Sequence, residues 1–462
     1  MPSSVRFLTL RMLSVFLLSF FHLRACHSSP SMQPLCHDDE SRALLQFKES
    51  IAINESASSD PSAYPKVSWR VDGESGDCCS WDGVECDGDS GHVIGLDLSS
   101  SCLHGSIDSN SSLFHLVQLR RLNLADNDFN NSKIPSEIRN LSRLFDLNLS
   151  MSGFSGQIPA EILELSKLVS LDLRENSLKL QKPGLQDLVE TLTNLEVLHL
   201  SGVEISSKVP QIMANLSSLS SLFLRDCGLQ GEFPMGIFHL PNLRFLSIRL
   251  NPYLMGYLPE FHWGSHLEML LLARANFSGQ LPECIGNLKS LNEFNVANCY
   301  FSGVIPSSLG NLTTLNYLDL SDNKLYGPIS ESIFRLPNLE TLNLEENLFG
   351  GTVEFGLLKS RSLVSFQLSG NNLSVIGNHN DSAALPKIQI LGLGGCNLSG
   401  EFPSFLHGQN HLEFVELGGN KIEGHIPKWF MNLGTTTLWY LNLRGNLLTG
   451  FEQSVDILPW NI

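Results

Sequence analysis

The sequence predicts an α/β solenoid, in which short strands alternate with turns and short helical segments in stacked units. Two observations predict this fold class. Leucine and isoleucine recur at fixed offsets through residues 309–329, and the position that ends each leucine run recurs every 24 residues from Val203 to Asn371. Units this regular do not bury an apolar face alone, so they must stack on one another. We therefore expect function on a long exposed surface.

The spacing of leucines changes within each unit, and the change predicts local structure. Leu309, Leu312 and Leu315 lie three residues apart, which suits turns or short 3-10 segments. Leu318 and Leu320 then alternate with polar residues as a strand does. A strand this short is not stable alone. Successive strands are therefore expected to pair in parallel, about 4.8 Å apart, in one continuous sheet.

A column of mostly small or amide side chains follows the strands. After each strand the chain turns inward, and its backbone amides and carbonyls need partners away from water. Asparagine offers both a donor and an acceptor, and cysteine is a small, weak substitute. We therefore expect structural rather than redox roles for the cysteines of this column. Its members are Ser101, Asn127, Ser152, Asn176, Val203, Cys227, Asn251, Ala275, Cys299, Asn323, Asn347, Asn371, Cys396, Asn420 and Asn446.

The N-terminus predicts export. Arg6 and Arg11 precede an apolar run over residues 12–23, and small and polar residues follow, so residues 1–28 are expected to be a signal peptide. That run is too short to span a bilayer, and no later segment approaches the roughly 20 apolar residues that a membrane helix needs. The net charge of -17 disfavours nucleic acid and anionic membranes as main partners.

Eleven Asn-x-Ser/Thr sequons agree with an exported protein. Repeats rich in asparagine, leucine and serine also produce such triplets by chance, so both interpretations stay open. The predicted glycosylation sites are Asn54, Asn110, Asn130, Asn140, Asn148, Asn215, Asn276, Asn311, Asn372, Asn380 and Asn397.

The signal peptide and the repeat pattern divide the chain into four parts. After the signal peptide, residues 30–92 form a non-repeating N-terminal cap, residues 93–450 hold about fifteen repeats, and residues 451–462 form an incomplete repeat. Within the cap, apolar spacing over residues 41–51, behind acidic residues 38–40, predicts a helix.

The cap also holds four cysteines whose pairing is constrained by spacing. Three pairings exist, and joining the adjacent Cys78 and Cys79 demands strained geometry. We prefer disulfides joining Cys36 to Cys78 and Cys79 to Cys86. Closing the longer loop contributes about 3 to 4 kcal/mol, which matters in a small cap with little core.

The fuller repeat reads Leu-x-x-Leu-x-Leu-x-x-Asn-x-Leu-x-Gly-x-Ile-Pro. It resembles the plant-specific class of extracellular leucine-rich repeats. Residues 80–86, Ser-Trp-Asp-Gly-Val-Glu-Cys, followed by His-Val-Ile-Gly-Leu-Asp-Leu at 92–98, resemble the entry cap of plant receptor-like proteins and receptor kinases. The prolines that end the units are Pro135, Pro159, Pro210, Pro234, Pro259, Pro282, Pro306, Pro403 and Pro427.

This resemblance implies a right-handed superhelix with a concave parallel β-sheet and with turns and 3-10 segments on the convex side. It also implies perception of peptides or pathogen molecules at the cell surface, together with a partner receptor kinase. The chain departs from the family where it stops at residues 458–462, inside another unit, before a closing cap or membrane helix. Leu441, Leu443 and Leu448 then lack a neighbour on one side. We therefore interpret the chain as a truncated relative.

Strand residues between the core leucines are expected to face the concave side and to form columns across units. One column is His199, Phe223, Ser247 and Leu271. Aromatic, sulfur and arginine side chains are common interface anchors, so this region is the predicted ligand-binding patch. The alternative is that large residues scatter on any concave sheet. The predicted ligand-binding residues are His199, Phe223, Arg225, Phe245, Arg249, Met269, Leu271 and Arg274.

Two further features of the concave side have open interpretations. Asp319, Asp322, Glu345 and Glu346 could receive a basic peptide, although solvated charge is the simpler interpretation. Asn148 occupies a strand position within a sequon, and a glycan there would keep ligands away from the third repeat.

Signals for catalysis and cofactors are weak. Gly392, Gly394 and Gly395 fall in the strand-turn register and lack the lysine of a phosphate loop. The acidic residues Asp82, Glu85, Asp87 and Asp89 lack the loop pattern of a calcium site, so a solvated cap loop is preferred. No nucleophile elbow, His-Glu-x-x-His or kinase signature occurs. We expect no enzyme activity, no cofactor and no metal.

The leading functional hypothesis is an extracellular ligand-recognition module of a plant receptor-like protein, active in defence or development through a partner kinase. Its ligand is expected to be a peptide or protein. The alternatives are a secreted inhibitor of cell-wall hydrolases, similar to the polygalacturonase-inhibiting proteins, and a non-functional receptor fragment. The chain as written is expected in the apoplast, or at the plasma membrane if it is part of a receptor.

Overall fold

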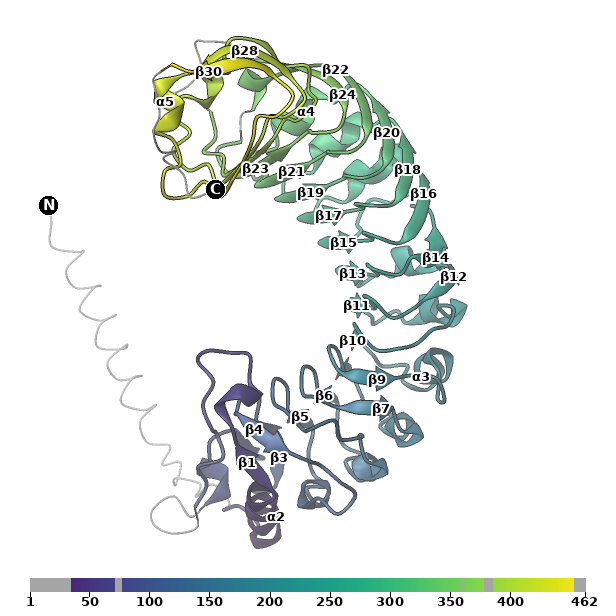
Figure 1. The fold of residues 1–462 in the computed structure, drawn as a ribbon. Helices are drawn as coiled ribbons and strands as arrows, with labels where there is room; N and C mark the ends of the chain where they lie inside the picture. The colour runs from purple at the N-terminus through teal and green to yellow at the C-terminus, as the bar shows by residue number, and fades with distance from the viewer. Residues whose placement is uncertain (1–34, 71–76, 359, 378–384, 453–462) are drawn as a thin grey trace, which may run out of the picture.

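The computed structural model describes residues 35–70, 77–358, 360–377 and 385–452. The chain winds into a curved solenoid whose strands line the inner side of an arc and whose short helices lie on the outer side (Figure 1). The expected signal peptide, residues 1–28, and positions 453–462 of the expected incomplete repeat lie outside the described residues. No helix in the described part is long and apolar enough to cross a membrane.

The inner face is one sixteen-stranded sheet. Its first pair, β2 and β3, is antiparallel, and every later neighbour is parallel. The predicted parallel sheet is therefore confirmed. In order, its strands are β2 (Val84–Cys86), β3 (Val93–Asp97), β5 (Arg121–Asn123), β6 (Asp146–Asn148), β8 (Ser170–Asp172), β10 (Val197–His199), β11 (Ser221–Phe223), β13 (Phe245–Ser247), β15 (Met269–Leu271), β17 (Glu293–Asn295), β19 (Tyr317–Asp319), β21 (Thr341–Asn343), β23 (Ser365–Gln367), β25 (Ile390–Gly392), β27 (Phe414–Glu416) and β29 (Tyr440–Asn442).

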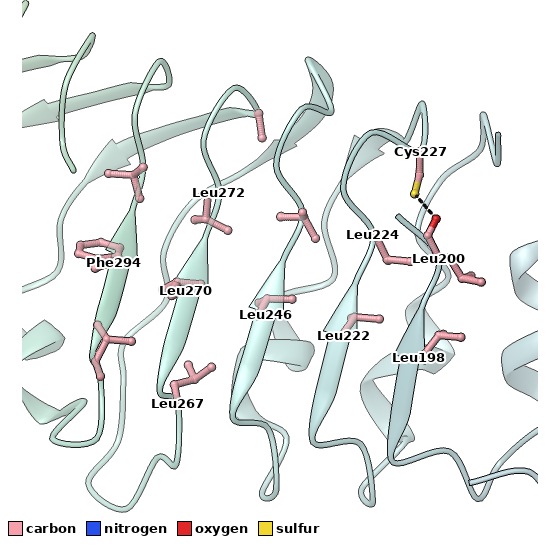
Figure 2. Close-up of a cluster of buried hydrophobic side chains, with 14 of the residues drawn as sticks. Leu198, Leu200, Leu222, Leu224, Cys227, Leu246, Leu267, Leu270, Leu272 and Phe294 are labelled. Atoms are coloured by element: carbon pink, nitrogen blue, oxygen red, sulfur yellow. Dashed lines mark hydrogen bonds between the residues drawn. The ribbon is translucent and has the colours of Figure 1, made fainter. Parts of the chain in front are cut away.

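Leucine at the centre of each strand fixes the register of this sheet. Leu198, Leu222, Leu246 and Leu270 pair in sequence across four strands, and each is fully buried. Figure 2 shows these side chains pointing to the same side of the sheet. Because side chains alternate along a strand, the residues before and after each leucine face the open curve of the arc.

A second set of strands lies beside the inner sheet, and the sequence analysis did not predict it. These strands follow the asparagine-type column and pair in parallel with one another in separate smaller sheets. They are β7 (Ser155–Gln157), β9 (Ser177–Lys179), β12 (Gln230–Glu232), β14 (Tyr253–Gly256), β16 (Asn276–Gln280), β18 (Tyr300–Gly303), β20 (Lys324–Gly327), β22 (Leu348–Glu354), β24 (Asn372–Ile376), β26 (Ser399–Gly400), β28 (Lys421–Ile426) and β30 (Leu447–Phe451).

Short helices form the convex side, as the leucine spacing predicted. Proline begins many of them because its fixed φ suits a helix start and its missing N–H costs nothing there. Gly286 lets two such segments approach closely, since a Cβ atom there would lie 2.5 Å from the Ser308 carbonyl oxygen. The helices are the 3-10 segments η3 (Ser112–His115), η4 (Ser136–Asn140), η5 (Ala160–Glu164), η6 (Gln211–Asn215), η7 (Met235–His239), η8 (Glu283–Asn287), η9 (Ser307–Asn311), η10 (Phe355–Leu357) and η12 (Ser404–Leu406), and the α-helices α3 (Leu185–Thr191), α4 (Glu331–Phe334) and α5 (Lys428–Met431).

The asparagine column satisfies backbone groups between units, as the sequence predicted. Asn251 is fully buried, and its Oδ1 accepts hydrogen bonds from the amides of Cys227 and Leu229 at 3.1 and 3.0 Å. Its Nδ2 donates to the carbonyls of Leu224 and Ile248 at 2.8 and 2.9 Å. One side chain thus links two successive units and closes its own turn.

The cap differs from the sequence prediction at its helix. The helix α2 spans Asp38–Glu49, so the acidic residues lie inside its first turn rather than before it. Ile51 does not extend the helix but begins β1 (Ile51–Ile53), which pairs antiparallel with β4 (Leu103–Gly105). The cap also contains the 3-10 segments η1 (Glu55–Ala57) and η2 (Cys78–Ser80).

Disulfides and a tryptophan pair hold the cap together. Cys36 is joined to Cys78 and Cys79 to Cys86, the pairing preferred from the sequence. The Trp69 ring stacks 5.6 Å from that of Trp81. Both tryptophans are buried, so the cap covers the first repeat with a small apolar core.

The last described unit is less buried than those before it. Leu441 and Leu443 are partly buried, whereas Val415 and Leu417, at the same positions one unit earlier, are fully buried. Leu448 is also partly buried. These exposures match the expectation for leucines with a neighbouring unit on one side.

Candidate functional site

The predicted concave column exists in register. His199 pairs with Phe223, Phe223 with Ser247, and Ser247 with Leu271, each on the next parallel strand. Phe245 pairs with Met269 in the adjacent column. The sequence spacing therefore placed these residues together correctly, and whether they bind a ligand stays a prediction.

Their exposure is uneven. Phe223, Phe245 and Met269 are half-buried and offer apolar surface, whereas Ser247 and Leu271 are 2% and 7% exposed. The His199 ring lies 4.5 Å from that of Phe223 in an edge contact. Leu271 therefore contributes little surface to a partner, and the apolar part of the patch is mainly aromatic.

The arginines of the patch differ in their partners. Arg225 Nη1 lies 3.2 Å from Glu175 Oε1, so part of its charge is already paired. Arg249 and Arg274 form no ion pair with any described acidic residue. The Nε atoms of Arg225 and Arg249 are buried without a hydrogen-bond partner in the described structure. Buried donors without a partner are unusual in proteins, and these two lie within the predicted patch.

Acidic groups lie at the end of β19 and just after β19 and β21, and β17 separates these strands from the patch. Asp319 is only 8% exposed, so the solvated-charge interpretation is wrong for this residue. Burial raises the pKa of Asp319, and burial followed by Asp319 and Asp322 raises the pKa of Glu345. Burial together with Asp319 also raises the pKa of Tyr317 to about 12, while Arg249 opposes that shift. The acidic groups therefore begin two strands beyond β15, the last strand of the predicted patch.

Three strands bring a serine, a histidine and an aspartate together, a constellation that the sequence analysis did not find. His199 Nε2 lies 2.8 Å from Ser221 Oγ, and its Nδ1 lies 3.4 Å from Asp172 Oδ2. A hydrolase also needs an exposed nucleophile and free amides for an oxyanion. Ser221 is 6% exposed, and its amide donates to the Glu196 carbonyl at 3.0 Å. We therefore interpret the triad as a hydrogen-bond network that orients His199.

The acidic cap residues are used by protein contacts. Asp87 Oδ1 accepts from the amide and hydroxyl of Ser90 at 3.1 and 2.9 Å, and Glu85 pairs with Arg121. Only one group of three potential metal ligands lies close together in the described residues. It consists of Cys36, Cys78 and Cys79, all of which are disulfide-bonded.

The cysteines of the asparagine column are unreactive in this environment. Burial raises the pKa of Cys227 to about 12, of Cys299 to about 11 and of Cys396 to about 12. Because the thiolate is the reactive form, nucleophilic and redox roles are disfavoured.

An aromatic cluster near the end of the inner sheet was also missed from the sequence. The rings of Phe414 and Tyr440, at paired positions on β27 and β29, stack 4.3 Å apart with an angle of 7° between them. Trp439 precedes Tyr440 and is 60% exposed. The sequence feature that could have predicted this cluster is an aromatic residue at the same position in two successive units.

Most strands of the inner sheet carry no predicted glycan acceptor. Asn148 on β6 is the one strand residue of the described inner sheet that lies in a sequon. From β8 to β29 the sheet carries none. The acceptors Asn215 and Asn311, at the ends of η6 and η9, are exposed. The predicted acceptor Asn380 lies outside the described residues. From β8 to β29 the inner sheet is therefore open to a ligand.

Comparison with known proteins identifies the repeat. Residues 37–87 match the leucine rich repeat N-terminal domain, residues 93–227 match a leucine-rich repeat region, and residues 289–349 and 411–433 match leucine rich repeats. Receptor-like protein 6 of Arabidopsis thaliana is 39% identical over 288 residues, which are 59% of this chain and 29% of that protein. Receptor-like protein Cf-9 of Solanum pimpinellifolium is 37% identical over 314 residues, with 60% and 33% covered.

Solved structures agree with the fold. A TDR receptor superimposes with a TM-score of 0.63 and 30% identity over 73% of this chain and 57% of that one. The plant peptide hormone receptor RGFR1 in complex with RGF2 superimposes with a TM-score of 0.54 and 26% identity over 80% and 68%.

The solenoid, its cap and its repeat define a leucine-rich-repeat protein. Within that class, the chain belongs to the plant receptor-like proteins. It spans about a third of the length of the receptor-like proteins that it matches.

Proposed function

We propose that this chain is the extracellular ligand-recognition part of a plant receptor-like protein, and that it binds a peptide or protein on its concave sheet. Binding rests on a surface that is ordered before the ligand arrives, so little conformational entropy is lost on the protein side. Defence or developmental signalling would then pass through a partner receptor kinase.

The observation that carries this proposal is the inner sheet between β10 and β15. There, the rings of His199 and Phe223 lie in register, and Phe245 lies in the adjacent column. Arg249 follows Phe245 in the same unit, and its Nε has no partner among the described residues. Aromatic residues and arginine are enriched among the residues that dominate binding energy at interfaces. The absence of sequons from β8 to β29 keeps this region accessible.

The similarity to solved receptors supports a peptide as the ligand. RGFR1 is a peptide hormone receptor whose structure contains RGF2, and its fold covers 80% of this chain. A peptide on this chain would extend along the curve, crossing one strand about every 4.8 Å.

The proposal can be tested with the full chain secreted from plant cells and presented to immobilised pools of random nonapeptides. We expect enrichment of a subset of sequences. The double variant Arg225→Gln with Arg249→Gln should capture that subset at least about fivefold less, because charge-assisted hydrogen bonds are lost. The matched control is Arg335→Gln, at an arginine that pairs with Glu331 on the convex side.

Equal capture by the double variant, with an unchanged circular dichroism spectrum, would count against the proposal. A parallel capture of purified cell-wall hydrolases addresses the inhibitor alternative. Tight binding of a hydrolase without capture of any peptide pool would favour that alternative.

A further inference from the structure

A cavity of about 420 Å³ opens at the rim of the solenoid, where the inner strands end and the chain turns toward the second set of strands. Its lining includes the apolar residues Leu250, Pro252 and Ala275 and the charged residues Asp226 and Arg274. A volume of this size is typical of ligand pockets.

A break in the asparagine column lies at this cavity. Ala275 occupies the column, is 2% exposed and has no amide side chain. One unit earlier, Asn251 occupies the same place with five hydrogen bonds to two units. The backbone amides that a column asparagine would bond here therefore need other partners.

The chain compensates for the missing amide with one extra residue. Two residues lie between Asn251 and Leu254, whereas one lies between Asn323 and Leu325. The Leu254 amide donates to the Asn251 carbonyl at 3.0 Å, which closes a turn around Pro252. In a regular unit the equivalent amide, such as that of Leu325, donates to the next asparagine instead, here Asn347 Oδ1 at 3.0 Å. Pro252, inside this turn, lines the cavity.

The two charged residues of the cavity have no ion-pair partner among the described residues. Asp226 and Arg274 are both exposed. They follow β11 and β15, with β13 between them, so about two strand spacings, roughly 10 Å, separate them. A negative and a positive group are thus both part of a lining that also contains apolar residues.

We propose that this rim cavity binds a short part of an extended peptide that carries opposite charges two residues apart, with the basic group toward Asp226 and the acidic group toward Arg274. Side chains at i and i+2 of an extended chain point the same way and lie about 7 Å apart at Cα. Long side chains such as lysine and glutamate span the remaining distance. The inference rests on the proposed role as a peptide-binding receptor part, and it places the ligand's two opposite charges at Asp226 and Arg274.

A glycan competes for the same opening. Asn276 lines the cavity and lies in a sequon with Ser278, so a sugar attached there would stand at its mouth. The Ser278→Ala substitution removes this acceptor without touching the charged pair, and it belongs in the test.

The test uses three immobilised nonapeptide pools, with Lys-x-Glu, Glu-x-Lys or Gln-x-Gln fixed at the centre and uncharged random residues elsewhere. The wild-type chain or Ser278→Ala should capture one charged order about fivefold better than the reversed order and the neutral pool. Exchanging the charges, Asp226→Arg with Arg274→Glu, should invert the preferred order. Both residue types already occur at this column with positive φ, as Arg274 and Glu346 show, so the exchange keeps the backbone.

Arg335→Gln should keep the wild-type preference. Equal capture of both charge orders by the wild type and by Ser278→Ala, or a preference that survives the charge exchange, would overturn the inference while leaving the proposed function standing. Capture of no pool at all would remove the proposed function and this inference together.

Discussion

The thiol of Cys227 donates a hydrogen bond to the backbone carbonyl of Leu200, 3.1 Å away in the preceding unit (Figure 2). In the next unit, Asn251 makes the equivalent contact through its amide nitrogen, to Leu224 at 2.8 Å. Cysteine thus keeps the donor that links two units but loses the acceptor. The column is held by hydrogen bonds whose number differs from unit to unit.

We predict that Asn251→Ala destabilises the solenoid more than Cys227→Ala does. Removing the buried amide leaves several backbone groups without partners, which costs about 3 kcal/mol or more. Removing the thiol loses one weak bond and leaves a small cavity, at about 1 to 2 kcal/mol. The urea concentration at the midpoint of unfolding should be lower for Asn251→Ala than for Cys227→Ala. A lower midpoint for Cys227→Ala would contradict the proposed role of the column.

Ser58 and Ser59 of the cap donate hydrogen bonds to the Asp126 carboxylate, and acid should weaken this contact. Burial raises the pKa of Asp126, but hydrogen bonds from Ser58, Ser59 and Ser100 outweigh it and lower the pKa to about 2. The folded value lies below the unfolded value of roughly 3.9. The contribution to stability is therefore complete above about pH 4 and is lost as the pH falls through about 2.

The corresponding measurement compares the wild type with Asp126→Asn. Because the carboxylate is largely accessible, solvent screening reduces its contribution to the order of 1 kcal/mol. The difference in melting temperature should be constant from pH 7 to 5 and should shrink from pH 4 toward 2. A difference that does not change with pH would show that the hydrogen bonds do not depend on the charge.

The two disulfides should contribute unequally. The Cys36–Cys78 bond closes a sequence separation of 42 residues and the Cys79–Cys86 bond one of 7. Loop-closure entropy then predicts losses of about 4 and about 2.5 kcal/mol when each pair is replaced by serine. Amide hydrogen exchange of the cap measures the loss of stability in each double variant. Equal protection of the cap amides in the two variants would show that the two disulfides contribute equally.

The Ser221, His199 and Asp172 network should be structural. Because Ser221 is buried and its amide is already bonded, the wild type should hydrolyse p-nitrophenyl acetate no faster than Ser221→Ala. A clear excess of wild-type activity, abolished in both Ser221→Ala and His199→Ala, would instead assign catalysis to these strands.

Much of the fold follows from the sequence because the repeat fixes it. Leucines at constant offsets set the register, so the alignment of His199 with Phe223 was predictable without coordinates. The amide-bonding role of Asn251 was predictable because a turning chain leaves backbone groups that need partners. Cysteine spacing disfavoured only the pairing that joins Cys78 to Cys79, and the structure has the preferred one of the remaining two.

Other features could not be predicted from the repeat, because they depend on departures from it in two or more neighbouring units. The rim cavity is lined by Ala275 in one unit and by Pro252, in the turn with an extra residue before Leu254, in another, and neither signals a cavity alone. The contact between His199 and Ser221 joins unlike positions of different units. The burial of Asp319 depends on the neighbouring strands, which a count of charges does not show.

A glycan placed on the inner sheet tests the concave-surface proposal most directly. Phe245→Asn turns residues 245–247 into an Asn-x-Ser acceptor at the centre of the patch, since Ser247 is already present. Phe245→Gln removes the same ring without adding an acceptor. With occupancy verified by mass spectrometry, glycosylated Phe245→Asn should lose capture of the enriched peptides, and Phe245→Gln should retain part of it. Undiminished capture by the glycosylated variant would show that ligands bind elsewhere.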